Sequence, residues 1–326
     1  MEKIKALSLL SGGLDSTLAT KLIIEQGIEV LAINFYSPFC RCNRIKGCGS
    51  SAKFISEKLG IEVKRIFLGE EYLNIVKNPK YGYGKNLNPC IDCRILMFKK
   101  AKEYMEKDGY SFIITGEVLN QRPKSQTYKA LKIIESQTGL DGLILRPLSA
   151  QFLPETIPEK KGWIDRRKLL SIKGRTRKQQ IFFADFYGIK DYPCPSGGCL
   201  LTDPIFSKKV KDLIEFGDFN LENINLLKIG RHFRINPFLK LIIARDEEES
   251  KRLLSFKKEN DVVFINEKTK ITGILRGCFN EFSVRHSARI FAKYTKDNQV
   301  IIIIKGENKK IYVQPIPEIP EIFKIY

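Results

Sequence analysis

The stretch that decides the fold is Ser11-Gly12-Gly13-Leu14-Asp15-Ser16, which lies between an apolar run at residues 4–10 and a helical pattern at residues 16–26. The apolar run is typical of a buried strand, and Gly27 ends the helical pattern. A glycine-rich turn between a first strand and the following helix lies where open parallel sheets bind ligands. We therefore expect this turn to bind an anionic ligand.

The residue types of this turn suit a nucleotide phosphate. Gly12 and Gly13 let the backbone approach a phosphate closely, and the amides at the helix start point at the anion. Ser11 and Ser16 can donate hydroxyl hydrogens, and Asp15 can hold Mg²⁺ or orient the turn. The turn lacks the Gly-Lys-Ser/Thr of a Walker A loop and is not a dinucleotide fingerprint. A tight turn without a ligand is the alternative, which the full six-residue pattern disfavours.

Short apolar runs and helical patterns alternate through the first half of the chain. This alternation predicts a doubly wound parallel sheet with helices on both faces. After Thr202 the pattern becomes β-rich, with one clear helix at residues 247–256. We expect an α/β domain that binds the anionic ligand at residues 1–202 and a smaller β-rich α+β domain at residues 203–326. The expected strands are residues 28–35, 61–68, 112–115, 233–244, 261–266, 271–275, 288–294, 300–305 and 310–315.

The charge of the chain indicates a polyanionic partner. The 326 residues include 56 Lys and Arg against 37 Asp and Glu, a net charge of +19. This excess favours nucleic acid over an anionic membrane, because Lys-rich proteins of hot environments usually balance Lys with Glu. A basic run in the middle of the chain is expected to contact phosphates, although a solvated basic face is the alternative. Its members are Arg166, Arg167, Lys168, Arg175, Arg177 and Lys178.

The sequence shows no signal-peptide pattern ahead of the glycine turn and no apolar stretch long enough to span a bilayer. We therefore expect a cytoplasmic protein. In a reducing compartment its eight cysteines are expected to serve metal binding or sulfur chemistry rather than a disulfide framework.

Two cysteine groups far apart in the sequence are candidate catalytic and metal-binding residues. Cys90 and Cys93 are spaced to share one face at the start of a helix, whose N-terminus is expected to stabilise thiolates. Cys194 and Cys199 bound a turn-rich loop. Together they could bind zinc or an iron–sulfur cluster, or carry a persulfide, and buried inert thiols are the alternative. A third group, Cys40, Cys42 and Cys48, fits either a metal site or structural thiols.

Several motifs resemble a known enzyme family. The turn at residues 11–16 resembles the pyrophosphatase-loop signature, and the later motifs resemble the tRNA 4-thiouridine synthetase (ThiI) family over roughly residues 1–200. A Cys-to-Asp difference at the position of Cys90 separates the chain from the similar tRNA 2-thiouridylases. The motifs are Cys90-Ile91-Asp92-Cys93-Arg94, Thr115-Gly116-Glu117-Val118-Leu119, Gln121, Ser125-Gln126-Thr127 and Leu145-Arg146-Pro147-Leu148.

This resemblance implies ATP cleavage between the α and β phosphates, adenylation of a uracil carbonyl in tRNA, and replacement of its oxygen by sulfur. It implies a sulfur donor, which could be a cysteine desulfurase, a carrier protein or free sulfide. The cysteine at position 90 favours a [4Fe-4S] cluster held by three thiolates, with zinc or a persulfide relay as alternatives. The implied ATP and Mg²⁺ site comprises Ser11, Gly12, Gly13, Asp15, Ser16, Gly116 and Gln121.

A second resemblance lies in the carboxyl part. Residues 227–234, which include Arg231, His232 and Arg234, resemble the NFACT-R (DUF814) RNA-binding module. The synthetases usually carry an N-terminal THUMP domain, so we expect the C-terminal domain to hold the tRNA here, with these three side chains at the RNA. The rival hypotheses are a deazaguanine-synthase-like ligase, whose cysteines would be compactly grouped, and a non-catalytic RNA-binding protein, which would not need the intact loop.

Overall fold

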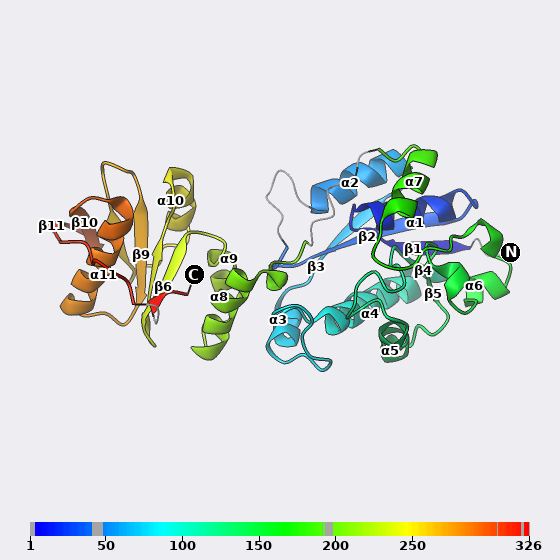
Figure 1. Cartoon of the computed structure of the whole chain (residues 1–326), viewed down its shortest axis with the longest axis horizontal. Helices are drawn as coiled ribbons and strands as arrows, with labels where there is room; N and C mark the ends of the chain where they lie inside the picture. The colour runs from blue at the N-terminus through cyan, green and yellow to red at the C-terminus, as the bar shows by residue number, and fades with distance from the viewer. Residues whose placement is uncertain are drawn as a thin grey trace. The chain divides into compact units, whose positions relative to one another are not determined.

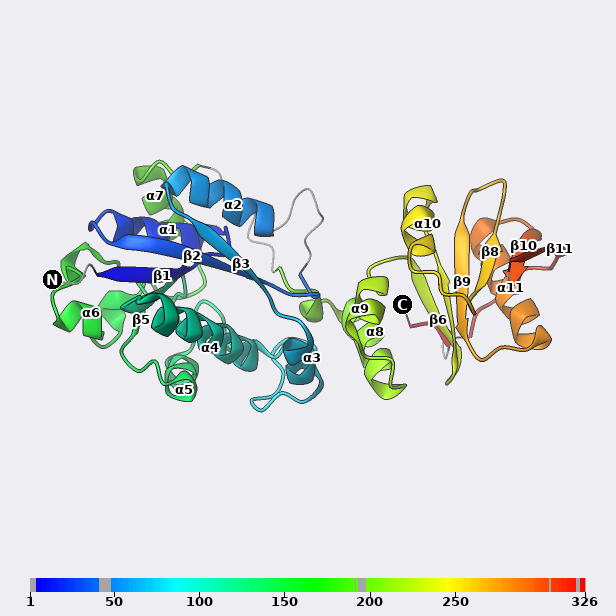
Figure 2. The ribbon, with the colours of Figure 1, turned by 180° about the vertical axis from the view of Figure 1, so that it is seen from behind.

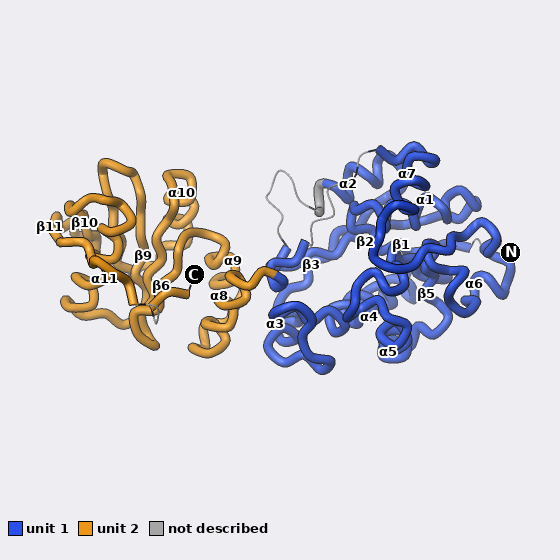
Figure 3. The backbone as a smooth tube through the Cα atoms, viewed as in Figure 1, with its two compact units in different colours: residues 1–202 blue, residues 203–326 orange. Residues whose placement is uncertain are grey.

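The computed structural model describes residues 4–40, 48–190, 192, 198–304, 306–320 and 323–325, with only the backbone of residues 48–50. The chain divides into two compact units, residues 1–202 and residues 203–326 (Figure 3). No helix among the described residues combines the length and the apolar composition needed to cross a bilayer. The two units are described in turn.

Unit 1 is built on a parallel sheet, as the sequence predicts. Over the described residues the strand order is β3-β2-β1-β4-β5, and every neighbouring pair is parallel. The chain leaves β1 in one direction to reach β2 and later returns to its other side with β4, so the strand order reverses between β1 and β4. Ligands bind outside the carboxyl ends of the strands at such a switch point. The strands are β1 Lys5–Leu9, β2 Glu29–Tyr36, β3 Val63–Phe67, β4 Phe112–Thr115 and β5 Ile144–Leu145.

Helices cover both faces of this sheet (Figure 1, and from behind in Figure 2). The helices α1 Leu14–Ile24, α2 Cys48–Leu59 and α7 Lys178–Phe186 lie on one face, and α4 Cys90–Asp108 and α5 Tyr128–Thr138 lie on the other. Strands β1, β2 and β4 are buried over most of their length, as expected for the middle of a covered parallel sheet, whereas the edge strand β3 is only partly buried. The remaining helices are α3 Glu70–Lys77, α6 Ile157–Lys160 and the 3₁₀ turns Ala150–Phe152, Arg166–Lys168 and Leu200–Thr202.

Unit 2 contains an antiparallel sheet with the order β11-β10-β8-β9-β7-β6 over its described residues. Alternate residues of β7 point to opposite faces. Leu241 and Ile243 pack with Phe291 of α11, whereas Ile242 packs with Leu253 of α10. The elements are α8 Pro204–Glu215, α9 Leu221–Leu226, β6 Arg231–Asn236, β7 Leu239–Ile243, α10 Glu247–Leu254, β8 Val262–Ile265, β9 Thr272–Gly277, α11 Glu281–Thr295, β10 Gln299–Ile304 and β11 Glu307–Tyr312.

Two of the predicted strands in unit 2 are wrong. Residues 233–244 form a hairpin of two strands rather than one strand. Residues 288–294 belong to helix α11, whose start is fixed by Asn280, since its side chain accepts a hydrogen bond from the amide of Ser283. A short apolar run cannot distinguish a strand from a buried helix segment by periodicity alone. His286 lies in the same helix. Helices α8 and α9 were not expected from the sequence pattern.

A buried ion cluster joins α8 to the first hairpin of unit 2. Arg234 is 7% exposed, and its guanidinium donates to both carboxylate oxygens of Asp212, at 3.0 and 2.6 Å. Asp218 accepts from the same guanidinium at 3.2 Å, and the Lys240 ammonium lies 3.4 Å from Asp212. Each charge in the cluster therefore depends on a partner that is itself buried.

Removing the central cation should destabilise unit 2. We expect Arg234→Met to lower the free energy of unfolding by about 3–5 kcal/mol, because it leaves Asp212 buried beside Lys240 alone. The matched control is Lys251→Met, which breaks an exposed pair with Glu247 and should leave the unfolding midpoint unchanged. Urea denaturation of the whole chain, followed by circular dichroism, measures both. Equal midpoints for the two variants would contradict the structural role of Arg234.

Candidate active site

The glycine turn at residues 11–16 forms a compact loop at the carboxyl end of β1, called the nucleotide loop below after the ligand expected from the sequence. Helix α1 begins at Leu14, two residues earlier than expected, so Asp15 and Ser16 lie in its first turn. The first helical hydrogen bond runs from the amide of Thr17 to the carbonyl of Gly13 at 3.0 Å, which leaves the preceding amides without helical acceptors. The hydroxyl of Ser16 donates to the same carbonyl at 3.0 Å and lies 3.0 Å from the Ser11 hydroxyl. These hydroxyls hold the loop in a shape suited to a phosphate.

Two glycines allow other parts of the backbone to pack closely against this loop, one at Gly12 and one at Gly116. A Cβ atom on Gly12, whose φ is +78°, would lie 2.7 Å from the amide nitrogen of Ala52 at the start of α2. A Cβ atom on Gly116, the residue after β4, would lie 2.4 Å from the amide nitrogen of Ser16. Gly116 therefore acts by bringing the segment after β4 against the loop, at the point where the strand order reverses.

Asp15 is held by the segment that follows Gly116. Its Oδ2 accepts a hydrogen bond from the side-chain amide of Gln121 at 3.1 Å, whereas its Oδ1 is buried with no hydrogen-bond partner within the described part of the chain. Burial raises the pKa of this carboxyl, and nearby Arg177 and Arg122 oppose the rise. An orphaned carboxylate oxygen beside a phosphate loop suits a hard cation such as Mg²⁺. Gln121 positions Asp15 from the side.

One residue of the basic run, Arg177, lies near this loop. Lys173 pairs with Leu119 in a parallel bridge, and the amide of Gly174 donates to the Leu119 carbonyl at 2.7 Å. This pairing brings Arg177 within electrostatic reach of Asp15, with its Nε buried and lacking a hydrogen-bond partner among the described residues. Arg177 therefore faces the nucleotide loop rather than an open RNA surface.

Arg122, which the sequence reasoning missed, links the nucleotide loop to the thiols. Burial lowers its pKa, with the neighbouring Arg94 acting in the same direction, while Cys90, Asp15 and Glu117 favour its charged form. It therefore lies within electrostatic reach of both Asp15 and Cys90. Guanidinium groups are well suited to bind phosphates. Arg122 directly follows Gln121, which was expected at the ATP site, and this position could have suggested a role. The sequence alone does not show which way the Arg122 side chain points.

Behind Arg94 lies a buried chain of ion pairs that explains two of the sequence motifs. Arg94 pairs with Glu117 at 3.4 Å, Glu117 also accepts from Arg146 at 3.1 Å, and Arg146 donates in turn to Glu135. Arg146 is only 3% exposed. The Arg-Pro-Leu motif thus serves to hold Glu117, which in turn orients Arg94 at the start of α4.

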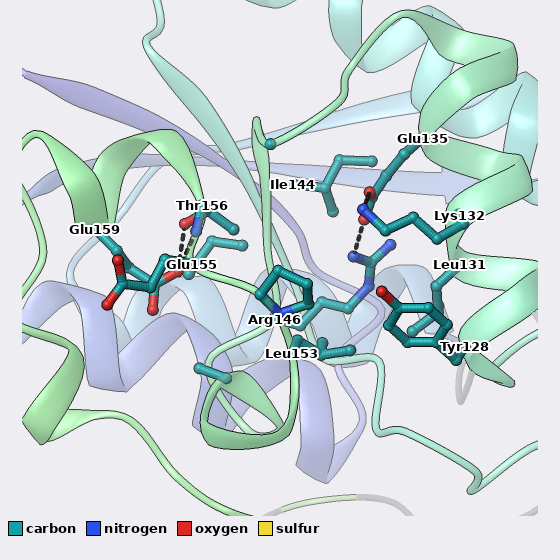
Figure 4. Close-up of a pocket in the computed structure, with 14 residues that line it drawn as sticks. Tyr128, Leu131, Lys132, Glu135, Ile144, Arg146, Leu153, Glu155, Thr156 and Glu159 are labelled. Atoms are coloured by element: carbon teal, nitrogen blue, oxygen red, sulfur yellow. Dashed lines mark hydrogen bonds and ion pairs between the residues drawn. The ribbon is translucent and has the colours of Figure 1, made fainter.

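A small pocket is lined in part by Arg146 and Glu135, two members of this series of ion pairs. Figure 4 shows Arg146 reaching toward Glu135, with Thr156 and Glu159 hydrogen-bonded to each other on another part of the wall. The cavity holds about 40 Å³, room for a few water molecules but not for a nucleotide. It contains none of the residues expected to bind ATP or sulfur, so the candidate active site is the loop and thiol region.

The thiols of Cys93, Cys40 and Cys199 lie within electrostatic reach of the buried Tyr72 phenol, and Cys90 is one helical turn from Cys93. Cys90 and Cys93 occupy the first turn of α4, and the Tyr72 phenol hydrogen-bonds to Cys93. Cys199 pairs with Cys40 across an isolated antiparallel bridge, supported by the amide of Leu200 donating to the carbonyl of Phe39 at 2.7 Å. Cys40 and Cys199 both lie within electrostatic reach of Cys93. The sequence grouped Cys40 with its chain neighbours, whereas the structure places it with Cys199.

The expectation that the helix N-terminus stabilises thiolates at Cys90 and Cys93 is wrong for the thiols as the structure holds them. Burial raises the pKa of both, and it raises the pKa of Cys199 to about 12. Among the described residues, no three Cys, His, Asp or Glu side chains form a group that could hold a metal ion. Cys194, Cys42 and the side chain of Cys48 lie outside the described residues, so their expected roles stay predictions.

The basic residues expected at RNA in unit 1 divide into two sets. Arg175, Lys178, Arg167 and Lys168 are exposed. Arg166 is instead structural, since its guanidinium pairs with Glu159 and donates to the carbonyls of Ala150 and Leu153. The density of positive charge is therefore a poor guide to which side chains face outward.

In unit 2 the expectation for two of the three motif residues is corrected. His232 is 1% exposed, and its Nε2 lies 2.8 Å from the carbonyl oxygen of Ile229. Arg234 is committed to Asp212 and Asp218. Arg231 is half-buried, with its guanidinium over the ring of Tyr294. The motif thus secures β6 in the unit, and His232 and Arg234 are not available to contact RNA.

A parallel sheet of this order, with a Ser-Gly-Gly-x-Asp-Ser loop at its switch point, defines unit 1 as an α/β fold of the pyrophosphatase-loop class. Two protein-family models each match a part of the chain. Residues 2–152 match ThiI, described as thiamine biosynthesis protein, and residues 230–320 match the NFACT protein RNA binding domain. Both resemblances predicted from the sequence are confirmed.

Curated relatives agree with the first match. A probable tRNA sulfurtransferase of Thermoanaerobacter sp. is 31% identical over 148 residues, which cover 44% of the chain and 36% of that protein. A tRNA sulfurtransferase of Desulfurococcus amylolyticus is 29% identical over 217 residues, 67% of the chain and 40% of that protein. The chain thus spans well under half the length of these relatives. Among solved structures, a 4-thiouridine synthetase–RNA complex with bound ATP is 21% identical, with a TM-score of 0.41, over 68% of this chain and 53% of that one.

The raised pKa values predict the reactivity of the thiols. At pH 8 we expect iodoacetamide to alkylate Cys199 at least 100-fold more slowly than the exposed Cys278, because a pKa of about 12 leaves very little thiolate. Peptide mass spectrometry over a time course measures both rates in one sample. The control is the same reaction in denaturant, where the two rates should converge. Equal rates in the folded protein would show that Cys199 is not buried.

Proposed function

We propose that this chain catalyses ATP-dependent thiolation of a uridine in tRNA. The observation that carries the proposal is the close approach of the segment after β4 to the glycine loop, where Gln121 hydrogen-bonds to Asp15 and the next residue, Arg122, lies within electrostatic reach of Cys90. An activating group and a sulfur-carrying group must act on the same carbon, so they need a shared site. The tRNA sulfurtransferases among the relatives support the same reaction.

The first step is adenylation of the base. ATP lies with its phosphates on the amides of the loop, and Arg122 and Arg177 neutralise the charge that develops as bonds change. The uracil carbonyl oxygen bonds to the α-phosphorus, and pyrophosphate leaves with the electrons of the broken P–O bond. Asp15 Oδ1 would hold Mg²⁺, which supplies electrostatic stabilisation of the leaving phosphates when bound.

The second step replaces oxygen with sulfur. Sulfur bonds to the activated carbon, and AMP departs with the former carbonyl oxygen. If the sulfur arrives as a persulfide on Cys199 or Cys194, a second thiol of the site forms a disulfide with that cysteine, which balances the electrons. The donor would be a cysteine desulfurase, a carrier protein or free sulfide.

The thiol set also suits a metal group by its chemistry. Thiolates of Cys90, Cys93 and either Cys199 or Cys194 are the ligands that iron–sulfur clusters and zinc prefer, and binding would release the protons that burial keeps on the described thiols. A cluster with three protein ligands would supply an open iron site for sulfide. In the structure the described thiols of Cys90, Cys93 and Cys199 influence one another electrostatically but do not form a group that could hold a metal ion, so a cluster would require them to move closer together or to use Cys194.

Unit 2 is proposed to hold the RNA. Its match to an RNA-binding domain and the net charge of +19 both support this role. The buried parts of its sequence motif stabilise the unit, so the contacts would come from exposed basic side chains.

The loop assignment predicts the behaviour of one substitution. Asp15→Asn should lower pyrophosphate release from ATP in the presence of bulk tRNA by at least about 100-fold, while tRNA affinity stays unchanged. The matched control is Asp165→Asn, which alters an exposed carboxylate paired with Arg167. Normal turnover by Asp15→Asn would disprove the assignment of the loop.

The visible absorbance of the protein tests whether its cysteines hold an iron–sulfur cluster. Anaerobically purified protein should show sulfide-to-iron charge-transfer absorbance, and Cys90→Ala or Cys93→Ala should remove it because each deletes a ligand. Cys278→Ala, which changes an exposed cysteine, is the control and should keep the colour. Cys199→Ala would bleach the protein only if Cys199 rather than Cys194 is the third ligand. A colourless active protein, with zinc or no metal, would reject the cluster and leave the persulfide route.

A further inference from the structure

The outer face of helix α7 carries large apolar side chains that the core does not use. Phe182 and Phe186 are 65% and 73% exposed, and Ile181 beside them is 42% exposed. The next residues along the helix, Phe183 and Tyr187, pack inward against the core that α7 shares with α1. The fold is therefore complete without the outer rings.

The outer rings are nevertheless held in place. Phe182 contacts Phe183 edge to face with ring centroids 5.4 Å apart, and Phe186 contacts Tyr187 in the same way at 5.1 Å. Because Phe182 and Phe186 are four residues apart, they stand about 6 Å apart along one face of the helix. They form two neighbouring aromatic platforms with exposed faces.

Positive charge surrounds these platforms. The segment from residue 173 to residue 190 contains five basic residues and one acidic residue, Asp185. Arg175, Lys178 and Lys190 are exposed. Just before the helix, the ammonium of Lys173 lies 4.3 Å from the centroid of the partly exposed Phe152 ring. A second copy of this face would be repelled by the like charge, whereas a polyanion would be attracted.

The helix also starts at the nucleotide loop. Arg177, the residue that precedes α7, lies within electrostatic reach of Asp15. The bridge between Lys173 and Leu119 fixes the chain just before this point. A strand of nucleic acid that follows the exposed face of α7 toward its first residue is thereby led to the loop.

We propose that α7 is an RNA-docking helix, on which Phe182 and Phe186 stack with unpaired bases while Lys178 and Arg175 contact the adjoining phosphates. Aromatic rings interleaved with basic side chains are the usual means of holding single-stranded nucleic acid without reading its sequence. This inference rests on the proposed function, and it assigns to unit 1 a hold on the RNA of its own. It places the substrate nucleotide next to the residues that activate it.

The test is the double variant Phe182→Ala/Phe186→Ala in the full chain. We expect its affinity for bulk tRNA to fall at least about tenfold, because stacking is lost at two bases. The tRNA concentration that gives half-maximal pyrophosphate release should rise by the same factor. The variant Phe182→Tyr/Phe186→Tyr keeps the rings and should retain wild-type affinity. The control is Tyr128→Ala, which removes an exposed ring on α5, on the other face of the sheet.

A charge variant tests the phosphate contact independently. Lys178→Gln should weaken binding and reduce the slope of log affinity against log salt by about 1. Wild-type affinity in the double alanine variant, with its melting temperature unchanged, would overturn the proposal while leaving tRNA thiolation intact. Loss of self-association with unchanged RNA affinity would assign the face to a protein partner instead. If the wild-type chain neither bound tRNA nor released pyrophosphate, the proposed function itself would fail.

Discussion

The contact between Gly116 and the Asp15–Ser16 peptide is the constraint on which the rest of the site depends. It exists because β4 returns beside β1, and because the residue after β4 has no side chain to keep the loop away. The segment that directly follows Gly116 is then set against this loop. Gln121 hydrogen-bonds to Asp15, and the next residue, Arg122, lies within electrostatic reach of both Asp15 and Cys90. A larger residue at position 116 would separate the two halves of the chemistry.

A second feature of the site is its concentration of positive charge, which buried ion pairs partly offset. Arg94, Arg122 and Arg177 concentrate positive charge where phosphates would sit, and such a concentration is unfavourable until an anion binds. The buried pairs of Arg94 with Glu117 and of Arg146 with Glu117 and Glu135 offset part of this cost. The buried pairs therefore limit repulsion among these arginines, and the positive charge that remains would favour an anionic ligand.

The sequence predicted those features that follow from local patterns. The glycine loop, the parallel sheet and the start of α4 at Cys90 each have a periodicity or a turn residue that marks them. Features set by tertiary contacts could not be read. Residues 288–294 are as apolar as a strand, and only the cap at Asn280 and the packing of Phe291 make them helical. Cys40 meets Cys199 through a bridge between segments far apart in the chain. Arg234 is likewise buried against Asp212 of α8, a helix that the sequence pattern did not reveal.

The residues that end unit 1 are tied down at three successive positions. Leu200 donates to Phe39, Leu201 accepts from Leu87, and Thr202 accepts from the side chain of Asn86. All three bonds lie between Cys199 and the peptide that leads into unit 2 at Asp203. The backbone that follows the Cys199 thiol is therefore clamped by contacts made within unit 1 itself.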